Sequence, residues 1–163
     1  MFSTVVPSNQ NERNFLLPAN FGIKCLKFKY RKNRMNSFQK EITVSVDDLD
    51  DLNHVNNVRY VQWIQDISKE HWQTKASPIM QDEVIWVVLS HHIEYKRAAV
   101  LNDRIKITTY IDSSSGAKSI RVVEMKHAVT NKLLVKSSTE WCLLESKSYK
   151  PMRIPDDIKE IFI

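Results

Sequence analysis

The pattern of apolar and polar positions along this chain changes its period once, at a short acidic stretch near residue 50. Before it, residues 39–47 alternate apolar and polar side chains, the period of two that is typical of a half-buried strand. After it, two stripes at near-helical spacing predict an amphipathic helix over about residues 55–74. The stripe expected to be apolar contains Val55, Val58, Val61, Ile64 and Ile67. The acidic stretch is therefore predicted to join a strand to a helix.

Four β-rich runs follow this helix, whose end is marked by Ser77 and Pro78. They cover residues 84–95, 104–111, 119–125 and 133–144. Turn-forming residues separate the runs, and a short last helix is expected at 156–162. One long helix cannot cover both faces of a five-stranded sheet. We therefore expect an α+β fold in which a curled antiparallel sheet wraps around the helix.

The acidic stretch carries the densest cluster of candidate catalytic side chains. Four aspartates, one histidine and three asparagines occupy residues 47–57. The first turn of a helix has unpaired N–H groups and the positive end of the helix dipole, so it can hold an anion or a developing oxyanion. The same residue types are also preferred helix N-caps. For Asp47, Asp48 and Asp51 we favour capping or solvation over chemistry.

The string D-x-x-x-H-V-N-N-x-x-Y-x-x-W, which runs from Asp50 to Trp63, resembles the signature of hotdog-fold thioesterases. These include single-domain acyl-CoA thioesterases of the 4-hydroxybenzoyl-CoA thioesterase type and plant acyl-ACP thioesterases. Segments within residues 91–103 and 141–155 are similar to later motifs of the same proteins. The resemblance implies a hotdog fold, a curled five-stranded antiparallel sheet around one long central helix, as a single domain over residues 35–163.

The resemblance also assigns roles to individual residues of the motif. It implies that Asp50 acts as general base toward water or as nucleophile through a mixed anhydride, two alternatives that the sequence leaves open. The N–H of Asn57 would polarise the thioester carbonyl. His54 would orient substrate or water, or would be a helix-start histidine satisfied by backbone. The family commonly has glycine where Asn53 stands, and asparagine tolerates the left-handed backbone that such a turn needs.

Three further residues are candidates for contact with the substrate. Tyr60 and Trp63 follow at helical spacing and would line the acyl site, although core packing is the interpretation we favour for both. Arg97 would meet the phosphates of CoA, with Lys96 and Arg59 as alternatives, although solvated charge is the more usual role of such residues.

The resemblance favours an acyl-CoA thioesterase, a hydrolase without a cofactor, over an acyl-ACP thioesterase. Plant acyl-ACP thioesterases carry further catalytic residues at positions that are Leu52, Ala98 and Ala99 here. A dehydratase of the same fold and a non-catalytic acyl-thioester binding protein are competing hypotheses. The resemblance implies a homodimer, and a tetramer of dimers fits equally well, because sheet edges are usually paired.

The distribution of charge along the chain bears on the other classes of protein that the sequence could encode. Residues 1–34 hold seven Lys or Arg against one acid, so the net charge of +5 belongs to this part. We expect it to be a poorly ordered basic extension upstream of a true start at Met35, with a nucleic-acid or membrane-surface arm and a weak organelle-targeting segment as alternatives.

The sequence predicts neither a metal site nor a membrane-spanning segment. Cys25 and Cys142 lie far apart and in no metal-site spacing, which suits a reducing compartment and a cytoplasmic protein. No Gly-rich phosphate loop and no apolar run of about 20 residues is present. We therefore expect no metal, no nucleic acid and no membrane among the partners.

Overall fold

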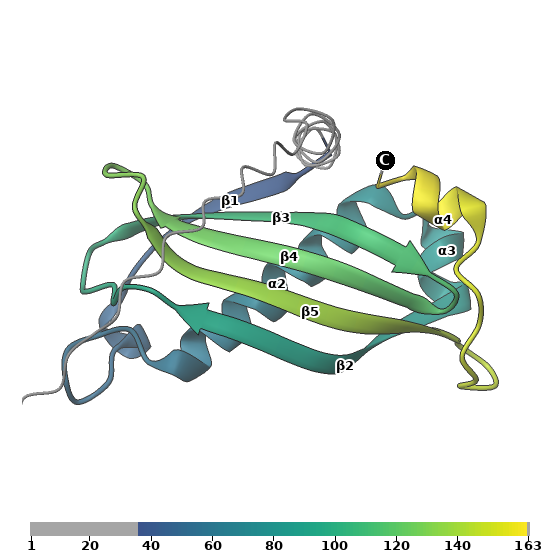
Figure 1. Ribbon diagram of the computed structural model, residues 1–163, viewed down its shortest axis with the longest axis horizontal. Coiled ribbons are helices and arrows are strands. Elements are labelled where there is room, and N and C mark those ends of the chain that lie inside the picture. The colour runs from purple at the N-terminus through teal and green to yellow at the C-terminus, as the bar shows by residue number, and fades with distance from the viewer. Residues whose placement is uncertain (1–35, 163) are drawn as a thin grey trace, which may run out of the picture.

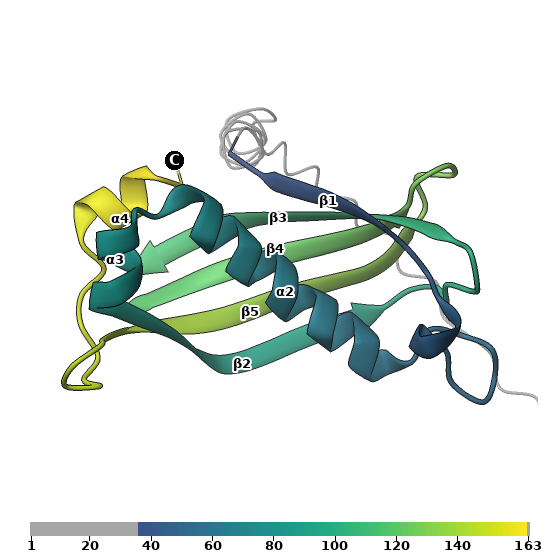
Figure 2. The ribbon, with the colours of Figure 1, turned by 180° about the vertical axis from the view of Figure 1, so that it is seen from behind.

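A computed structural model of the chain describes residues 36–162, so the predicted basic extension at residues 1–34 lies outside the described residues. Five strands form one antiparallel sheet in the order β1-β3-β4-β5-β2. They are β1 (Phe38–Thr43), β2 (Val84–Tyr95), β3 (Arg104–Ser115), β4 (Lys118–His127) and β5 (Leu133–Glu145). The long helix α2 (Asn57–Lys75) crosses one face of the sheet, which curves around it (Figure 1, Figure 2). The predicted hotdog fold is confirmed.

Two elements differ from the predicted boundaries near the ends of α2. β1 stops at Thr43, because the last residues of the predicted strand form a short 3-10 helix, η1 (Val46–Asp48). Ser77 and Pro78 follow the end of α2 as predicted, but they also begin a helix that the pattern missed, α3 (Pro78–Glu83). The hydroxyl of Ser77 accepts the N–H of Met80 at 3.2 Å, and proline suits the first turn of a helix.

The end of β3 and the last helix also differ from their predicted boundaries. β3 continues to Ser115 through residues predicted to form a turn, with a register shift between Ile111 and Ser113 that absorbs the polar stretch. The last helix, α4 (Asp156–Glu160), is slightly shorter than predicted. It lies beside α3 at the end of the sheet where α2 also ends (Figure 1, Figure 2).

The buried face of α2 is rotated from the predicted apolar stripe. Val58 was expected to face the core but is 69% exposed, whereas Ile64 on the same predicted stripe is 0% exposed. The reason is the attachment of the helix start to Ala99. The N–H of Val55 donates to the Ala99 carbonyl at 2.9 Å, and the hydroxyl of Tyr60 accepts the Ala99 N–H at 3.2 Å. These bonds turn Tyr60 inward and Val58 outward.

The interior under α2 is divided into an apolar part and a polar part. The N-terminal half of the helix packs on one hydrophobic cluster, whose buried members are Val44, Val55, Tyr60, Trp63, Ile64, Ile67, Ala99, Ile105, Ile107, Val123, Met125, Leu134 and Val135. Farther along, the helix buries Ser68 and His71, and β4 buries Arg121. The N-terminal half of α2 therefore stabilises the fold by burying apolar surface. Under the C-terminal half, polar groups are buried at a cost in desolvation free energy.

Replacement of Ile64 by alanine tests the observed helix face. We expect Ile64→Ala to lower the free energy of unfolding by about 2–5 kcal/mol, because the side chain is fully buried. Val58→Ala should change it by less than about 0.5 kcal/mol. Urea titrations followed by circular dichroism give both values, and equal losses for the two variants would contradict the observed orientation of α2.

Candidate active site

The loop between β1 and α2 is held in place by the carboxylate of Asp48. Its Oδ2 accepts the N–H and the hydroxyl of Ser45, each at 2.8 Å, and its Oδ1 accepts Nε–H of Arg59 at 2.7 Å. Burial acts to raise the pKa of Asp48, but the hydrogen bonds from Ser45 and Arg59 outweigh it and leave the pKa below its ordinary value. Asp48 forms a capping box with Ser45 at η1, whereas the long helix for which capping was expected has Asn56 as its N-cap, and the carboxylate of Asp48 is buried rather than solvated.

Asp50 and His54 close a tight turn directly before the helix. The N–H of Asp50 donates to the His54 carbonyl at 2.8 Å. In the other direction, Oδ1 of Asp50 accepts the N–H of Leu52 at 2.9 Å and that of His54 at 3.1 Å. Asn53 lies in the left-handed region at φ 58°, as expected where the family has glycine. One carboxylate oxygen is thus fixed by backbone, while the other has no hydrogen-bond partner among the described residues.

Asn57 is the first residue of α2, and its backbone N–H is one of the donors for which a helix start supplies no intrahelical acceptor. The side chain of the N-cap, Asn56, accepts the N–H of Val58 at 3.0 Å, and the Asn56 N–H donates to the Asp48 carbonyl at 2.9 Å. The N–H of Asn57 between them has no partner within residues 36–162. One short loop therefore carries a carboxylate oxygen and, seven residues later, an N–H that both lack partners among residues 36–162, with the exposed imidazole of His54 between them in sequence.

The three residues predicted to contact substrate have other partners in this structure. Tyr60 and Trp63 are buried members of the hydrophobic cluster, and their rings meet edge to face at a centroid distance of 5.4 Å. Arg97 is exposed, and its Nη1 donates to the Leu133 carbonyl at 3.2 Å. Core packing of Tyr60 and Trp63 agrees with the interpretation that we favoured, and a substrate contact by any of the three remains a prediction.

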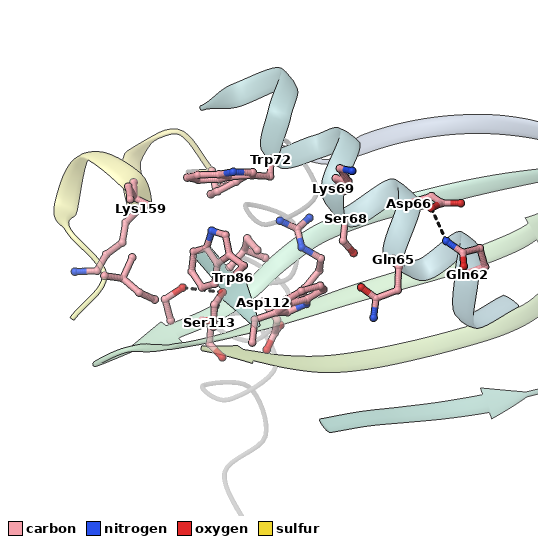
Figure 3. Close-up of a pocket in the computed structure, with 18 residues that line it drawn as sticks. Gln62, Gln65, Asp66, Ser68, Lys69, Trp72, Trp86, Asp112, Ser113 and Lys159 are labelled. Carbon is pink, nitrogen blue, oxygen red and sulfur yellow. Dashed lines mark hydrogen bonds between the residues drawn. The ribbon is translucent and has the colours of Figure 1, made fainter. Parts of the chain in front are cut away.

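A cavity of about 730 Å³ lies beside the C-terminal part of α2 (Figure 3). Its apolar wall comes from the helix, the sheet and the segment that ends in α4, and consists of Trp72, Trp86, Ile111, Trp141, Ile154 and Ile158. In the close-up Trp72, Trp86 and Lys159 lie at one end and Gln62 and Asp66 at the other. Its volume is typical of a ligand pocket. None of Asp50, His54 and Asn57 lines it, so the candidate catalytic loop and the cavity are separate features of this chain.

A buried polar pair next to this cavity was missed by the sequence analysis. Arg121 and His71 are 5% and 1% exposed, and Nη1 of Arg121 donates to Nδ1 of His71 at 2.9 Å and to Oγ1 of Thr109 at 3.1 Å. A guanidinium only donates, so Nδ1 accepts and the imidazole proton lies on Nε2, which has no partner in the described part of the chain. Burial, and then the charges of Arg121 and Lys75, lower the pKa of His71 to about 3. The alternation of residues 119–125 could have shown that Arg121 points inward.

Three further observations concern the histidines of β2, metal-binding groups and the helices. His91 and His92 face opposite sides of β2, as expected, and Nδ1 of His91 lies 2.9 Å from Oγ1 of Thr139 while His92 is exposed. Residues 36–162 contain no group of three His, Cys, Asp or Glu side chains placed to hold a metal ion. No helix in that range is both long and apolar enough to cross a membrane.

Comparison with known proteins identifies a family over almost all of the described chain. The family model of the acyl-ACP thioesterase N-terminal domain matches residues 35–162. Among curated proteins, the chloroplastic acyl-[acyl-carrier-protein] hydrolase FATB3 of Cuphea viscosissima is 24% identical over 78 residues. That match covers 48% of this chain but only 19% of the Cuphea protein, so the chain spans a small part of this relative.

Solved thioesterase structures share the fold at low sequence identity. The probable thioesterase YbaW from Escherichia coli superposes with a TM-score of 0.66 and 23% identity, covering 76% of this chain and 94% of YbaW. A mutant 4-hydroxybenzoyl-CoA thioesterase in complex with 4-hydroxybenzoyl-CoA gives a TM-score of 0.71 and 12% identity, covering 78% of this chain and 99% of that one. Both likenesses place the chain in the hotdog fold.

The low pKa of His71 predicts a loss of stability in acid. The folded state keeps this imidazole neutral down to about pH 3, whereas an unfolded histidine binds a proton near pH 6.5. The unfolded state therefore binds more protons between these values, and stability falls as the pH falls, by about 1.4 kcal/mol per pH unit for one such group. In urea titrations at several pH values, His71→Gln should reduce that slope by this amount, while His92→Gln should leave it unchanged. An unchanged slope in His71→Gln would show that His71 is protonated in the folded protein.

Proposed function

Because the chain belongs to the family of acyl-ACP thioesterase N-terminal domains, we propose that it hydrolyses acyl thioesters with Asp50 as general base or nucleophile. The enzyme class, thioester hydrolase, is supported by this family and by the thioesterases that share its fold. The observation that carries the proposal is the junction before α2, where a fixed carboxylate precedes an unpaired N–H at the helix start.

The junction suits the chemistry of a thioester. The carbonyl carbon is already electrophilic, so catalysis requires a donor to the carbonyl oxygen and an activated water or carboxylate. The N–H of Asn57 is the donor, and the oxygen of Asp50 that lacks a partner removes a proton from water as the new C–O bond forms. The C–S bond then breaks, and the proton passes to the departing thiolate. Alternatively, Asp50 attacks the carbonyl directly, the C–S bond breaks to release the thiolate, and a mixed anhydride forms. Water then hydrolyses this anhydride to the free acid and restores Asp50.

His54 fits a positioning role in this mechanism. Its backbone is hydrogen-bonded to Asp50 in both directions, so its main chain is held next to the carboxylate. Its ring is exposed and is available to hold water or the substrate.

The carrier in our proposal is CoA, and acyl-ACP is the second candidate. The bound 4-hydroxybenzoyl-CoA of a structure with the same fold favours CoA. The family match and the Cuphea relative favour ACP. Both carriers present the same thioester, so the chemistry assigned to Asp50 and Asn57 is common to them. Leu52, Ala98 and Ala99, where plant acyl-ACP enzymes carry further catalytic residues, are the reason that we place CoA first.

We also propose a homodimer in the cytoplasm. β2 is an edge strand of the sheet, and its apolar residues Leu89 and Tyr95 are exposed in the single chain. A second copy across this edge would cover them and would close the outer side of the Asp50 loop. In such a dimer, Arg97 is a candidate for contact with the phosphates of CoA.

Replacement of Asp50 by asparagine tests this function. Asp50→Asn keeps an acceptor for the N–H groups of Leu52 and His54 but removes the base, so we expect thiol release from acyl-CoA to fall by about 10²–10⁴-fold. Release is followed with a thiol reagent over short, long and aromatic acyl groups. Asp51→Asn, at an exposed neighbouring carboxylate, is the matched control and should keep wild-type turnover.

Three results separate the alternatives. Loss of turnover in Asp50→Asn alone, with unchanged thermal unfolding, supports the proposal. Equal turnover in both variants assigns the chemistry to another residue. Absence of thiol release by the wild type from acyl-CoA and acyl-ACP would leave a protein that binds thioesters without hydrolysing them.

A further inference from the structure

We propose that the cavity beside α2 receives the far end of the acyl group and that Arg121 binds a carboxylate there, so that the preferred substrate is the thioester of a long ω-carboxy acid. The inference rests on the proposed function, because it assumes that an acyl thioester binds at the start of α2. It concerns a different part of the molecule and a different property, the chemistry of the distal end of the substrate.

Arg121 is a buried positive charge without a matching negative charge. Its side chain lines the cavity and is 5% exposed, and no carboxylate of residues 36–162 forms an ion pair with it within 4.0 Å. Burial lowers the pKa of Arg121 only to about 10, so the guanidinium stays charged at neutral pH. Removal of such a charge from water is unfavourable unless a partner compensates for it. A ligand carboxylate in the cavity would supply that compensation.

The guanidinium also has N–H groups that lack acceptors in the described part of the chain. It carries five N–H groups, and both hydrogen bonds that it forms with described side chains start from Nη1. Nε and Nη2 donate to no residue in the described part of the chain. The ring of Phe162 lies 5.4 Å from Cζ of Arg121, a cation–π contact that uses no N–H group of the guanidinium. Two parallel N–H groups along one edge match the two oxygens of a carboxylate.

The rest of the cavity suits a hydrocarbon chain. Three tryptophans, three isoleucines and Phe162 form the apolar part of its wall, and a polymethylene chain would pack along these side chains. The charged residues at its helix side, Asp66 and Lys69, belong to the exposed face of α2, and Asp66 already accepts the amide of Gln62 at 2.8 Å. Asp112 of β3 and Lys159 of α4 also line the cavity. Neither Asp66 nor Asp112 forms an ion pair with Arg121 within 4.0 Å, and burial alone shifts the pKa of Arg121.

The distance from the catalytic loop fixes the length of the substrate. Residues of α2 that line the cavity recur every three or four positions from Gln62 to Trp72, so it runs along one side of the helix. Arg121 meets α2 at His71, fourteen residues and about 21 Å along the axis from Asn57. An extended chain advances roughly 1.1–1.2 Å per bond, which corresponds to an acyl group of about sixteen carbons once the hydrogen bonds at both ends are included.

A comparison of acyl-CoAs that differ only at the distal end tests this inference. The full chain is assayed with sixteen-carbon acyl-CoAs that end in methyl, hydroxyl or carboxylate. We expect kcat/KM for the carboxylate-ended substrate to exceed that for the methyl-ended one by at least tenfold. Arg121→Met should remove or reverse this preference. Arg104→Met, at an exposed arginine of β3, should keep it.

The ratio of two substrates on one preparation does not depend on how much of a variant is folded, so a destabilised Arg121→Met still gives an answer. A wild type that prefers the methyl-ended or hydroxyl-ended substrate would overturn the inference and leave the proposed function intact. A preference for carboxylate that survives in Arg121→Met would overturn the role of Arg121.

A binding measurement keeps the inference testable if the wild type hydrolyses nothing. Trp72, Trp86 and Trp141 line the cavity, so their fluorescence reports on occupancy. Hexadecanedioic acid should change this fluorescence at lower concentration than its dimethyl ester does, and the difference should vanish in Arg121→Met. Equal responses to the diacid and the diester in the wild type would overturn the inference independently of catalysis.

Discussion

The candidate active site depends on one buried carboxylate that takes no part in the chemistry. Asp48 ties Ser45 at the end of the first strand to Arg59 in the first turns of α2, and its backbone carbonyl holds the N-cap residue Asn56. These bonds fix where the helix begins. The start of the helix in turn fixes the turn that carries Asp50 and leaves the N–H of Asn57 unpaired. The carboxylate of Asp50 and the N–H that we propose as oxyanion donor are thereby positioned by the same few residues, at the cost of one desolvated charge that is hydrogen-bonded on both oxygens.

The two halves of α2 contribute differently to stability and to function. Its first half packs on an apolar cluster, which stabilises the fold, and its second half carries His71, which is hydrogen-bonded to Arg121, and lines a cavity. Buried polar groups that lack partners are expensive, and proteins retain them mainly where a ligand uses them. In our account the first half supports the chemistry at the helix start and the second half selects the acyl group.

The sequence predicts the fold well because the determining signals are local. The change of period near residue 50 and the four later strands follow from spacing alone, and Asn53 adopts the left-handed conformation expected of it. Val58 was placed on the wrong face because the helix orientation is set by bonds to Ala99, forty-one residues away. The pairing of Arg121 with His71 also joins residues distant in sequence, and α3 begins at a serine and proline that end a helix equally well. Tertiary contacts of this kind leave no periodic signal.

The central claim is that the unpaired N–H at the start of α2 polarises the thioester carbonyl, and replacement of Asn57 by proline tests it most directly. Proline is favoured at the first helical position, and Asn56 before it already has the extended conformation that proline requires, with φ −60° and ψ 137°. The substitution therefore deletes the donor while the helix remains. We predict that kcat in Asn57→Pro falls by about 10²–10³-fold with unchanged thermal unfolding, whereas Asn57→Ala, which keeps the N–H, loses little. Wild-type turnover in a folded Asn57→Pro protein would contradict the account.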